Sequence, residues 1–585
     1  MQWMKTVWAA RGWPAMWALA ALTACGGGGG GSAPTTASAD SNGTVDDIGI
    51  YVSAIPPEVP TSDRDAVRLA DQASFGPTEA LVAQIKRVGA ARWVAEQMPM
   101  RFAKYTHGGN GSVHQNTSTV PYCDQPINAS AVCWRDNMST EPLVWNFYRN
   151  AMSQPDQLRQ RVALALQQIL VISGVEANGT YGHRAYQNMV LSESLGNYRV
   201  LLKKVALSPV MGDYLNNANN DKSAPNENFA RELLQLFTIG TCALQPDGTL
   251  TSGTCIPTYT NDTVRDYAHA LTGWTYPVGG GTPWGCWPAG ANCTYHEGEM
   301  VPVERYHDNA ARTLLSGVSL GAGHTAPVAL ERVLDSLMAH PNTGPFIGKQ
   351  LIQHLVSSNP SPAYVARVAA AFNSGRSGVF GSGQRGDLAA TVAAVLLDAE
   401  ARGETVRTAG GKLREPALMF TGVLRAMNGR TDGDALSWWW GEQLQQHMFR
   451  PPTVFNYYPA DYPVPGTSLL GPTFGIHNGN TALQRLNYLA YMIDWGGSNP
   501  DPMTPEAVGT KVEFGAFLGD APDAGKLVDR MSMLVLGHVL PPTARAEVVR
   551  AVSTRTASTE RDWQIGRVKT AAYLLFASPS YQVQR

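Results

Sequence analysis

Oxygen-bearing side chains crowd the stretch around positions 217–232, which makes this stretch the first candidate for chemistry. They belong to Asn217, Asn219, Asn220, Asp221, Asn226 and Glu227. Calcium takes 6–8 oxygen ligands, and a turn rich in Asn and Asp can supply several of them. The spacing is not that of an EF-hand loop. The sequence therefore leaves two alternatives, a calcium site or a solvent-exposed turn in which Asn226 caps the next helix.

Two glutamates continue this stretch into the expected helix. Glu227 precedes Arg231 by four positions, the order that favours an ion pair on a helix surface. Glu232 lies on a different face of that helix and could point into a cleft. Both glutamates are candidate catalytic residues, and the surface ion pair is the alternative for Glu227.

The adjacent pair His307 and Asp308 is the second candidate, directly after Tyr306. An imidazole next to carboxylates can act as a general base or a metal ligand, because its pKa lies near the working pH. Asp308 can equally cap a short helix that runs to Leu314. A shared site would require His307 to meet Glu227 or Glu232 in space.

A third candidate lies in the charged run Lys412-Leu413-Arg414-Glu415-Pro416. Pro416 suits the first turn of a helix, so the charges precede that helix. Arg414 could bind a carboxylate or phosphate through two parallel hydrogen bonds, and is a candidate catalytic residue. The alternative is a structural ion pair with an acidic side chain.

Aromatic residues cluster in the same part of the chain. The candidate ligand-binding side chains are Trp438, Trp439, Trp440, Tyr457 and Tyr458. Exposed rings could stack on sugar faces, whereas buried rings would anchor a loop to the helices. Three adjacent tryptophans on a helix cannot all face the core, so we expect at least one to face a ligand or solvent.

Composition and missing motifs exclude several classes of protein. Lys and Arg total 45 and Asp and Glu total 47, so the chain has no net basic field for a nucleic acid. The sequence contains no H-E-x-x-H, phosphate-binding loop, C-x-x-C or C-x-x-C-H motif. These absences exclude the common zinc-protease, nucleotide-binding-loop, cysteine-redox and haem-attachment assignments, and catalysis by another geometry is left open.

Helical periodicity dominates the chain from about Thr61, and helices must position these candidates. Phe229, Leu233, Leu236 and Phe237 form one apolar face in the helix after Asn226, with Gly240 beyond its end. We predict further helices at Asp63–Ala73, Thr78–Met98, Pro155–Ser173, Tyr198–Leu207, Thr263–Gly273, Pro327–Ala339, Pro345–Ser357, Pro362–Phe372, Asp387–Asp398, Glu415–Met427 and Gln564–Phe576.

Strand-like alternation is scarce, apart from possible short hairpins around residues 242–255 and 286–293. No repeat of fixed period appears, and no linker after residue 60 is long enough to separate domains. The sequence therefore predicts a mainly α fold. We expect one large multi-helical domain over residues 61–585, with irregular disulfide-bearing loops and at most minor β-hairpins.

The N-terminus has the features of an export signal. Residues 1–24 contain Lys5 and Arg11, no acid, and an apolar stretch too short to span a bilayer. They end in Leu22-Thr23-Ala24-Cys25, which resembles a bacterial lipobox with Cys25 as the lipidated residue; an ordinary secretory peptide is the alternative. The glycine-rich stretch that follows predicts a flexible tether over residues 25–60.

Six further cysteines fall into sequence-local pairs. They are Cys123, Cys133, Cys242, Cys255, Cys286 and Cys293. An even number in an exported chain indicates disulfides, and short loops favour pairing between neighbours. We therefore expect a membrane-anchored lipoprotein outside the cytoplasm, in the periplasm or at the outer membrane, since Gly26 permits outer-membrane sorting in a Gram-negative host.

Five ordered segments together resemble the bacterial family called domain of unknown function 1800. They are NENFARELLQLFTIG (226–240), VRDYAHALTGW (264–274), the stretch 340–372, GKLREP (411–416) and PPTVFNYY (451–458). The resemblance extends from about residue 62 to the C-terminus and implies one large, mostly helical exported domain. It also implies a gene neighbourhood with a second exported family, and it supplies no catalytic residues.

The sequence leaves two functions open. In the first, the chain is an enzyme, possibly hydrolytic, that acts on an extracellular or cell-surface polymer through His307, Asp308, Glu227, Glu232 and Arg414. In the second, it is a non-catalytic scaffold that binds another exported protein or a surface glycan. The expected partners are a membrane, through the lipid anchor, and one of these ligands; nucleic acid is excluded. Calcium is the one cofactor that the residues suggest.

Overall fold

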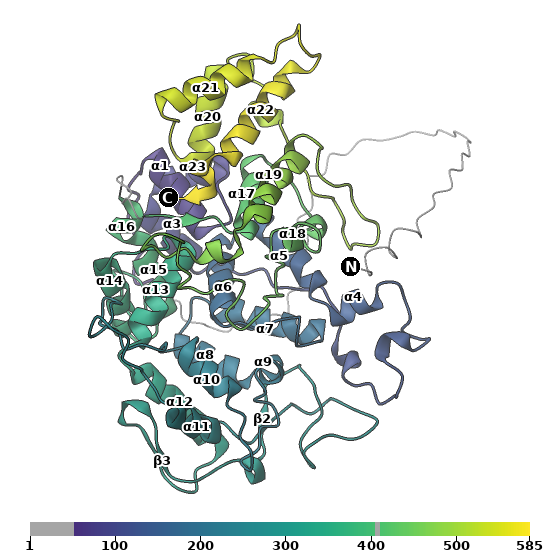
Figure 1. Cartoon of the computed structure of the whole chain (residues 1–585), viewed down its shortest axis with the longest axis vertical. Helices are drawn as coiled ribbons and strands as arrows, with labels where there is room; N and C mark the ends of the chain where they lie inside the picture. The colour runs from purple at the N-terminus through teal and green to yellow at the C-terminus, as the bar shows by residue number, and fades with distance from the viewer. Residues whose placement is uncertain (1–51, 404–409) are drawn as a thin grey trace. The chain divides into compact units, whose positions relative to one another are not determined.

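A computed structural model describes residues 52–403 and 410–585 (Figure 1). The expected signal peptide, Cys25 and the tether up to residue 51 lie outside the described residues. Residues 52–60, which the sequence assigns to the tether, already contact the helical domain. The amide of Ser53 donates to the Val379 carbonyl at 2.9 Å, and that of Val59 donates to the Val88 carbonyl at 3.2 Å. The folded chain therefore begins before residue 61.

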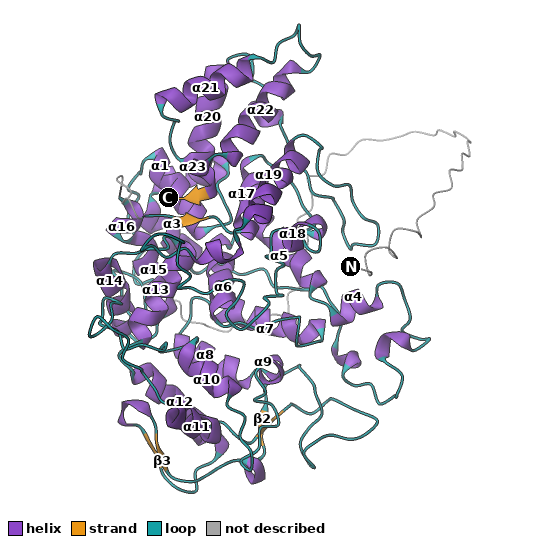
Figure 2. Cartoon of the chain, in the orientation of Figure 1, coloured by secondary structure: helices purple, strands orange, loops and turns teal. Residues whose placement is uncertain are grey.

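The described chain is mainly helical, as the sequence predicts (Figure 2). Its first helices are α1 (Asp63–Ala73), α2 (Glu79–Val88), α3 (Ala90–Gln97), α4 (Cys133–Met138), α5 (Glu141–Ser153), α6 (Gln157–Ile169), α7 (Thr180–Glu193), α8 (Tyr198–Leu207), α9 (Pro209–Tyr214), α10 (Asn228–Gln235) and α11 (Asn261–Ala270). They are followed by α12 (Ala326–Ala339), α13 (Thr343–Leu355), α14 (Pro362–Ser374), α15 (Leu388–Leu397), α16 (Ala399–Arg402), α17 (Pro416–Ala426), α18 (Trp440–Gln443), α19 (Gly479–Ile493), α20 (Ala524–Leu536), α21 (Pro542–Ser553), α22 (Trp563–Ala577) and α23 (Pro579–Gln582).

Strands form only short antiparallel pairs within the described residues. These are β1 (Trp274–Thr275) with β2 (Val301–Pro302), β3 (Arg312–Thr313) with β4 (Ser319–Leu320), and β5 (Lys412–Leu413) with β6 (Val583–Gln584). The hairpin expected at 242–255 is reduced to isolated bridges, and the described residues 286–293 contain no strand. The antiparallel pair β1–β2 flanks this disulfide loop on both sides, so the short hairpin expected around it is present but lies outside residues 286–293.

Several helices have the predicted bounds, and α1 and α8 match them fully. The predicted helix Thr78–Met98 is instead divided into α2 and α3 at Gly89, whose φ is 84°. A side chain at Gly89 would collide with the Val59 carbonyl, so only glycine fits this break. Helices α5, α7, α19, α20 and α21 were not predicted from the sequence, nor were the short helices α4, α9, α16 and α23.

Two hydrophobic cores hold the helices together. The first core contains residues of α1, α8, α10 and α13, including Leu69, Leu201, Leu233 and Leu351. The second contains residues of α5, α17, α19, α20 and α22. Helix α6 contributes to both, since Leu166 belongs to the first core and Leu164 to the second. Segments far apart in sequence therefore meet around α6.

Three disulfides are formed between neighbouring cysteines, as predicted: Cys123 with Cys133, Cys242 with Cys255, and Cys286 with Cys293. Such bonds persist in oxidising compartments outside the cytoplasm. In residues 52–403 and 410–585, no helix has the length and apolar character required to cross a bilayer.

Candidate functional site

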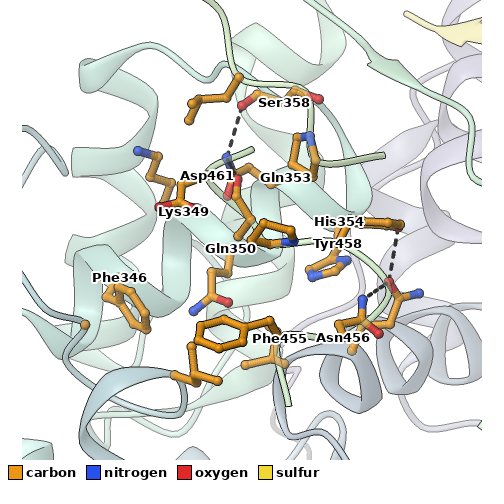
Figure 3. A pocket seen from close by; sticks show the side chains of 18 of the residues that line it. Phe346, Lys349, Gln350, Gln353, His354, Ser358, Phe455, Asn456, Tyr458 and Asp461 are labelled. Atoms are coloured by element: carbon orange, nitrogen blue, oxygen red, sulfur yellow. Dashed lines mark hydrogen bonds between the residues drawn. The ribbon is translucent and has the colours of Figure 1, made fainter. Parts of the chain in front are cut away.

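A cavity of about 270 Å³ lies where five distant segments meet, one of them the end of α10 with the loop from Leu236 to Gly248 (Figure 3). Helix α6 contributes Gln168, α13 contributes Lys349 through His354, the loop at 454–461 contributes Tyr458, and β5 contributes Lys412. We call it the Lys412 cavity. Its outer residues, Phe455 and Asp461, are exposed to solvent.

Glu415 is fully buried beneath this cavity, at the N-terminus of α17. Its Oε2 accepts hydrogen bonds from Gln446 Nε2 at 2.6 Å, Gln168 Nε2 at 2.9 Å and the Tyr458 hydroxyl at 2.9 Å. Burial raises the pKa of Glu415, but the nearby cations and these hydrogen bonds outweigh burial and lower it to about 2. The positive end of α17 favours the same ionised form.

Two buried cations lie opposite this carboxylate, at the C-terminal end of α13. Lys412 Nζ and Arg161 Nη2 both donate to the His354 carbonyl, the latter at 2.7 Å. Burial lowers the pKa of Lys412 to about 7, although Glu415 opposes the shift. Burial also lowers the pKa of the His354 imidazole, to about 3. Each charge therefore lies at a helix end of favourable sign, and Lys412 is partly neutral near pH 7.

The cavity has an apolar end and a polar end. Figure 3 shows Phe346 and Phe455 near Gln350 at one end, and His354, Tyr458 and Asn456 at the other. Gln350 Nε2 is buried and, among the described residues, has no hydrogen-bond partner. A ligand with one apolar face and a few polar groups fits such a lining.

The buried end of the cavity holds groups suited to proton transfer. A lysine whose pKa lies near 7 can accept a proton at neutral pH and return it. Tyr458 stays protonated, because burial and Glu415 raise the pKa of its hydroxyl far above the usual value. A neutral Lys412 next to a fixed Tyr458 and Asn456 is a geometry that can support general acid–base catalysis.

Among the described residues, no group of three or more His, Cys, Asp or Glu side chains is arranged to hold a metal ion. The oxygens of the Asn-rich turn instead accept backbone amides. Asn220 Oδ1 accepts from the Asn226 amide at 2.8 Å, and Asn226 Oδ1 accepts from the Asn228 amide at 2.9 Å. These bonds close the turn, and α10 begins at Asn228, two residues beyond the expected cap.

A model of the family described as "Protein of unknown function (DUF1800)" matches residues 68–583. The chain belongs to the DUF1800 family. No curated protein and no solved structure matches it significantly. Four of the five segments that carry the family resemblance contribute residues to the lining of the Lys412 cavity: 226–240, 340–372, 411–416 and 451–458. The fifth lies mostly on α11, which packs on α10.

His307 and Asp308 of this DUF1800 protein lie away from that cavity. The His307 imidazole is buried, and its Nδ1 bonds to the Thr272 carbonyl at 2.9 Å. Asp308 bonds His269 Nδ1 at 2.6 Å and pairs with Arg312 at 2.9 Å. Asp308 accepts the Ala310 amide in a turn rather than capping a helix. The expected short helix to Leu314 is absent there because β3 occupies part of this stretch.

Glu227 and Glu232 do not join His307 through any hydrogen bond or ion pair that the described residues form. Glu227 pairs with Arg231 at 2.8 Å, as its spacing predicts for a helix surface. Burial raises the pKa of Glu232. Neither glutamate lines the Lys412 cavity. The candidate catalytic residues chosen from sequence are therefore distributed over different places.

Arg414 forms a buried ion pair with Asp71 of α1, through two hydrogen bonds of 2.9 Å each. Its Nε also donates to the Tyr581 carbonyl at 3.1 Å. The guanidinium therefore binds α1 and α23. It forms the structural ion pair that the sequence left open as the alternative to ligand binding. The neighbours Lys412 and Glu415 supply the charges at the cavity instead.

The five aromatic candidates include both buried and exposed side chains. Trp440 is buried, Trp438 is partly exposed, and Trp439 is 65% exposed. Tyr457 is buried, and its hydroxyl donates to the His447 carbonyl at 2.6 Å. Tyr458 alone of the five lines the Lys412 cavity.

Sequence reasoning missed Lys412 and Glu415 as candidates, although both stood in the motif that it singled out. One signal was available: a lysine and a glutamate three positions apart at the start of an apolar helix. Such charges are buried only at a cost, so their position before α17 pointed to a partner. Arg161 and Gln168 gave no signal, because they lie within a helix pattern that also suits a surface.

Proposed function

We propose that this DUF1800 protein is an extracytoplasmic enzyme, hydrolytic in type, whose active site is the Lys412 cavity. Its substrate is the terminal or side group of an extracellular or cell-surface polymer. The observation that carries the proposal is Lys412, a buried lysine in the lining of a cavity that opens to solvent, with the buried charges of Arg161 and Glu415 behind it. Perturbed ionisable groups in a cavity are typical of active sites.

The size of the cavity supports a small group as the ligand. About 270 Å³ is close to the lower limit of small-molecule sites. A polymer could therefore insert one end group or substituent, while the rest of it stays outside near Phe455.

In this proposal neutral Lys412 takes a proton from water as the water oxygen bonds to the atom under attack. The bond to the leaving group breaks, and the proton passes from Lys412 to that group. Tyr458 and Asn456 orient the bound group. Lys349, which lines the cavity, provides positive charge for the negative charge that develops.

The test compares wild type, Lys412→Met and Tyr458→Phe on a panel of peptidoglycan, lipopolysaccharide and neutral and acidic polysaccharides, with products detected by mass spectrometry. We expect Lys412→Met to lower product formation by about 100-fold or more, because a general base is lost. Lys526→Met, which changes an exposed lysine of α20, is the matched control and should keep full activity. Full activity of Lys412→Met, or no product from wild type on any polymer, contradicts the proposal.

A second candidate function is binding without catalysis. It is favoured by the bond from Lys412 Nζ to the His354 carbonyl, which a purely structural cation would also form. In that case a polymer would raise the melting temperature of wild type without yielding product.

We also propose that Cys25 carries the lipid that anchors the domain to a membrane. The sequence around it supports the assignment. Metabolic labelling with an alkyne fatty acid should mark wild type and not Cys25→Ser. Equal labelling of both would contradict the anchor, with Cys123→Ser as a control for loss of a different cysteine.

A further inference from the structure

A second cavity, of about 510 Å³, lies between two loops, one of which a disulfide closes. One loop runs from Val113 to Pro121 and leads into the disulfide of Cys123. The other runs from Gly281 to Thr294 and contains the disulfide between Cys286 and Cys293. We call it the Trp284 cavity. The amide of Gly281 donates to the His114 carbonyl at 2.8 Å and joins the two loops.

Two indole rings line this cavity and remain open to solvent. Trp284 is 81% exposed and Trp287 is 83% exposed. Exposure of a large apolar side chain carries a cost in water, and two such side chains on one short loop mark an interaction surface. Indole faces are flat and apolar, which suits stacking on the C–H faces of a sugar ring.

The loop that carries these rings is held in place by its surroundings. The disulfide closes it, and Asn219 Nδ2 donates to the Trp287 carbonyl at 3.0 Å. Asn219 Oδ1 accepts from Thr275 Oγ1 at 2.6 Å, and that hydroxyl accepts from the Asn292 amide at 2.9 Å. A loop ordered before binding loses less entropy when a ligand binds.

The remaining lining is polar but uncharged. It contains amides and hydroxyls, and no Asp, Glu, Lys or Arg. Its one ionisable side chain is His114, whose pKa is lowered to about 4, mainly by burial and also by His296. Hydroxyl and amide groups bind sugar hydroxyls well, whereas an acidic polymer or a phosphate would require cations.

We propose that the Trp284 cavity is a binding site for an uncharged polysaccharide, which stacks on Trp284 and Trp287. The site is separate from the Lys412 cavity, since the two share no lining residue. The proposal therefore stands whether or not the Lys412 cavity is catalytic. Binding at the Trp284 cavity would hold the domain on a glycan surface.

The test is affinity electrophoresis of the full purified protein in gels that contain laminarin, xylan, galactomannan or dextran, with alginate and pectate as acidic counterparts. We expect retardation of wild type by at least one neutral polysaccharide, little change with added salt, and none by the acidic polymers. The double variant Trp284→Ala/Trp287→Ala should weaken binding at least tenfold. Both side chains are exposed, so this variant should fold.

Two controls make the outcome decisive. Trp495→Ala removes a tryptophan that is 77% exposed elsewhere and should bind as wild type does. Lys412→Met should also keep its glycan binding, which separates this site from the proposed active site. The proposal is overturned if no neutral polysaccharide retards wild type, if Trp495→Ala weakens binding as much as the double variant, or if only acidic polymers bind.

Discussion

The two cavities of this DUF1800 protein are built on opposite principles. The Lys412 cavity lies against charges that are buried between the ends of α13 and α17, and residues from five distant segments line it. The Trp284 cavity has an uncharged lining, supplied mainly by two loops, of which a disulfide closes one and the other precedes a disulfide. The first is thus an internal feature of the helical body, and the second belongs to its surface loops.

The two cavities therefore differ in whether a substitution at the site also changes the stability of the fold. Buried charges require compensation by partners, so a change at Glu415 should affect the whole domain. Exposed tryptophans need no compensation, so a change at Trp284 should affect binding alone.

The largest effect is expected from Glu415→Gln. It removes the negative charge that faces Lys412 and Arg161 and leaves two buried cations without a counter-charge. Loss of one partner of a buried charge network costs about 3–5 kcal/mol of the free energy of unfolding, measured in urea. The pKa of Lys412, measured by NMR of the reductively methylated protein, should fall below about 7, because Glu415 raises it.

Glu513→Gln is the matched control for this change. Glu513 is half exposed and pairs with Arg430 at the surface, so its loss should cost about 0.5 kcal/mol or less. If Glu415→Gln were as stable as the control, the charges at the Lys412 cavity would not be coupled in the way the geometry indicates.

The contrast also explains what could be predicted from sequence. Helices such as α1 and α8 follow from periodicity and caps, which are local. The disulfide pairing follows from short loops, which are local too. The break at Gly89 depends on the Val59 carbonyl, far enough away in sequence that no local pattern contains it.

The candidate site was harder to predict because it depends on side-chain direction. The motif at 411–416 was recognised, yet Arg414 points to Asp71 while Lys412 points to His354. Asp71 lies 343 residues from Arg414 and His354 lies 58 residues from Lys412, and a sequence pattern does not contain such distances. The Trp284 cavity was missed for a related reason: sequence reasoning chose the tryptophan run at 438–440, which is denser, over the two tryptophans of the disulfide loop.

A smaller loss of stability is expected at acidic pH. It arises from buried histidines, one of which, His114, lines the Trp284 cavity. Burial, and then His296, lower the pKa of His114 to about 4, and burial lowers that of His183 to about 4. In the unfolded chain both titrate near 6.5, so the unfolded state binds more protons between pH 6.5 and 4. Stability is therefore full above about pH 6.5 and is lost as pH falls toward 4, whereas Glu415 keeps its charge down to about pH 2.

His183→Gln isolates one of these groups. The glutamine amide can replace the bond from His183 Nε2 to the Ala177 carbonyl, which is 2.8 Å long. Wild type should lose roughly 2–3 kcal/mol more than the variant between pH 7 and pH 4, measured as free energy of unfolding in urea. Parallel curves for the two proteins would show that His183 is already protonated, or exposed, in the folded state.

The smallest effect on stability is expected from the double variant Cys286→Ser/Cys293→Ser. The loop that this disulfide closes is short, with a sequence separation of 7, so the chain-entropy model gives about 2 kcal/mol. The free energy of binding a neutral polysaccharide should fall by more than the free energy of unfolding does, because the freed loop must become ordered again when the ligand binds. Calorimetry should show this as a less favourable binding entropy. The disulfide between Cys242 and Cys255 closes no loop at the Trp284 cavity. The variant Cys242→Ser/Cys255→Ser should therefore leave polysaccharide binding unchanged. Equal loss of binding in both variants would mean that disulfides act through the fold as a whole, and the surface loops would then not be independent of the helical body.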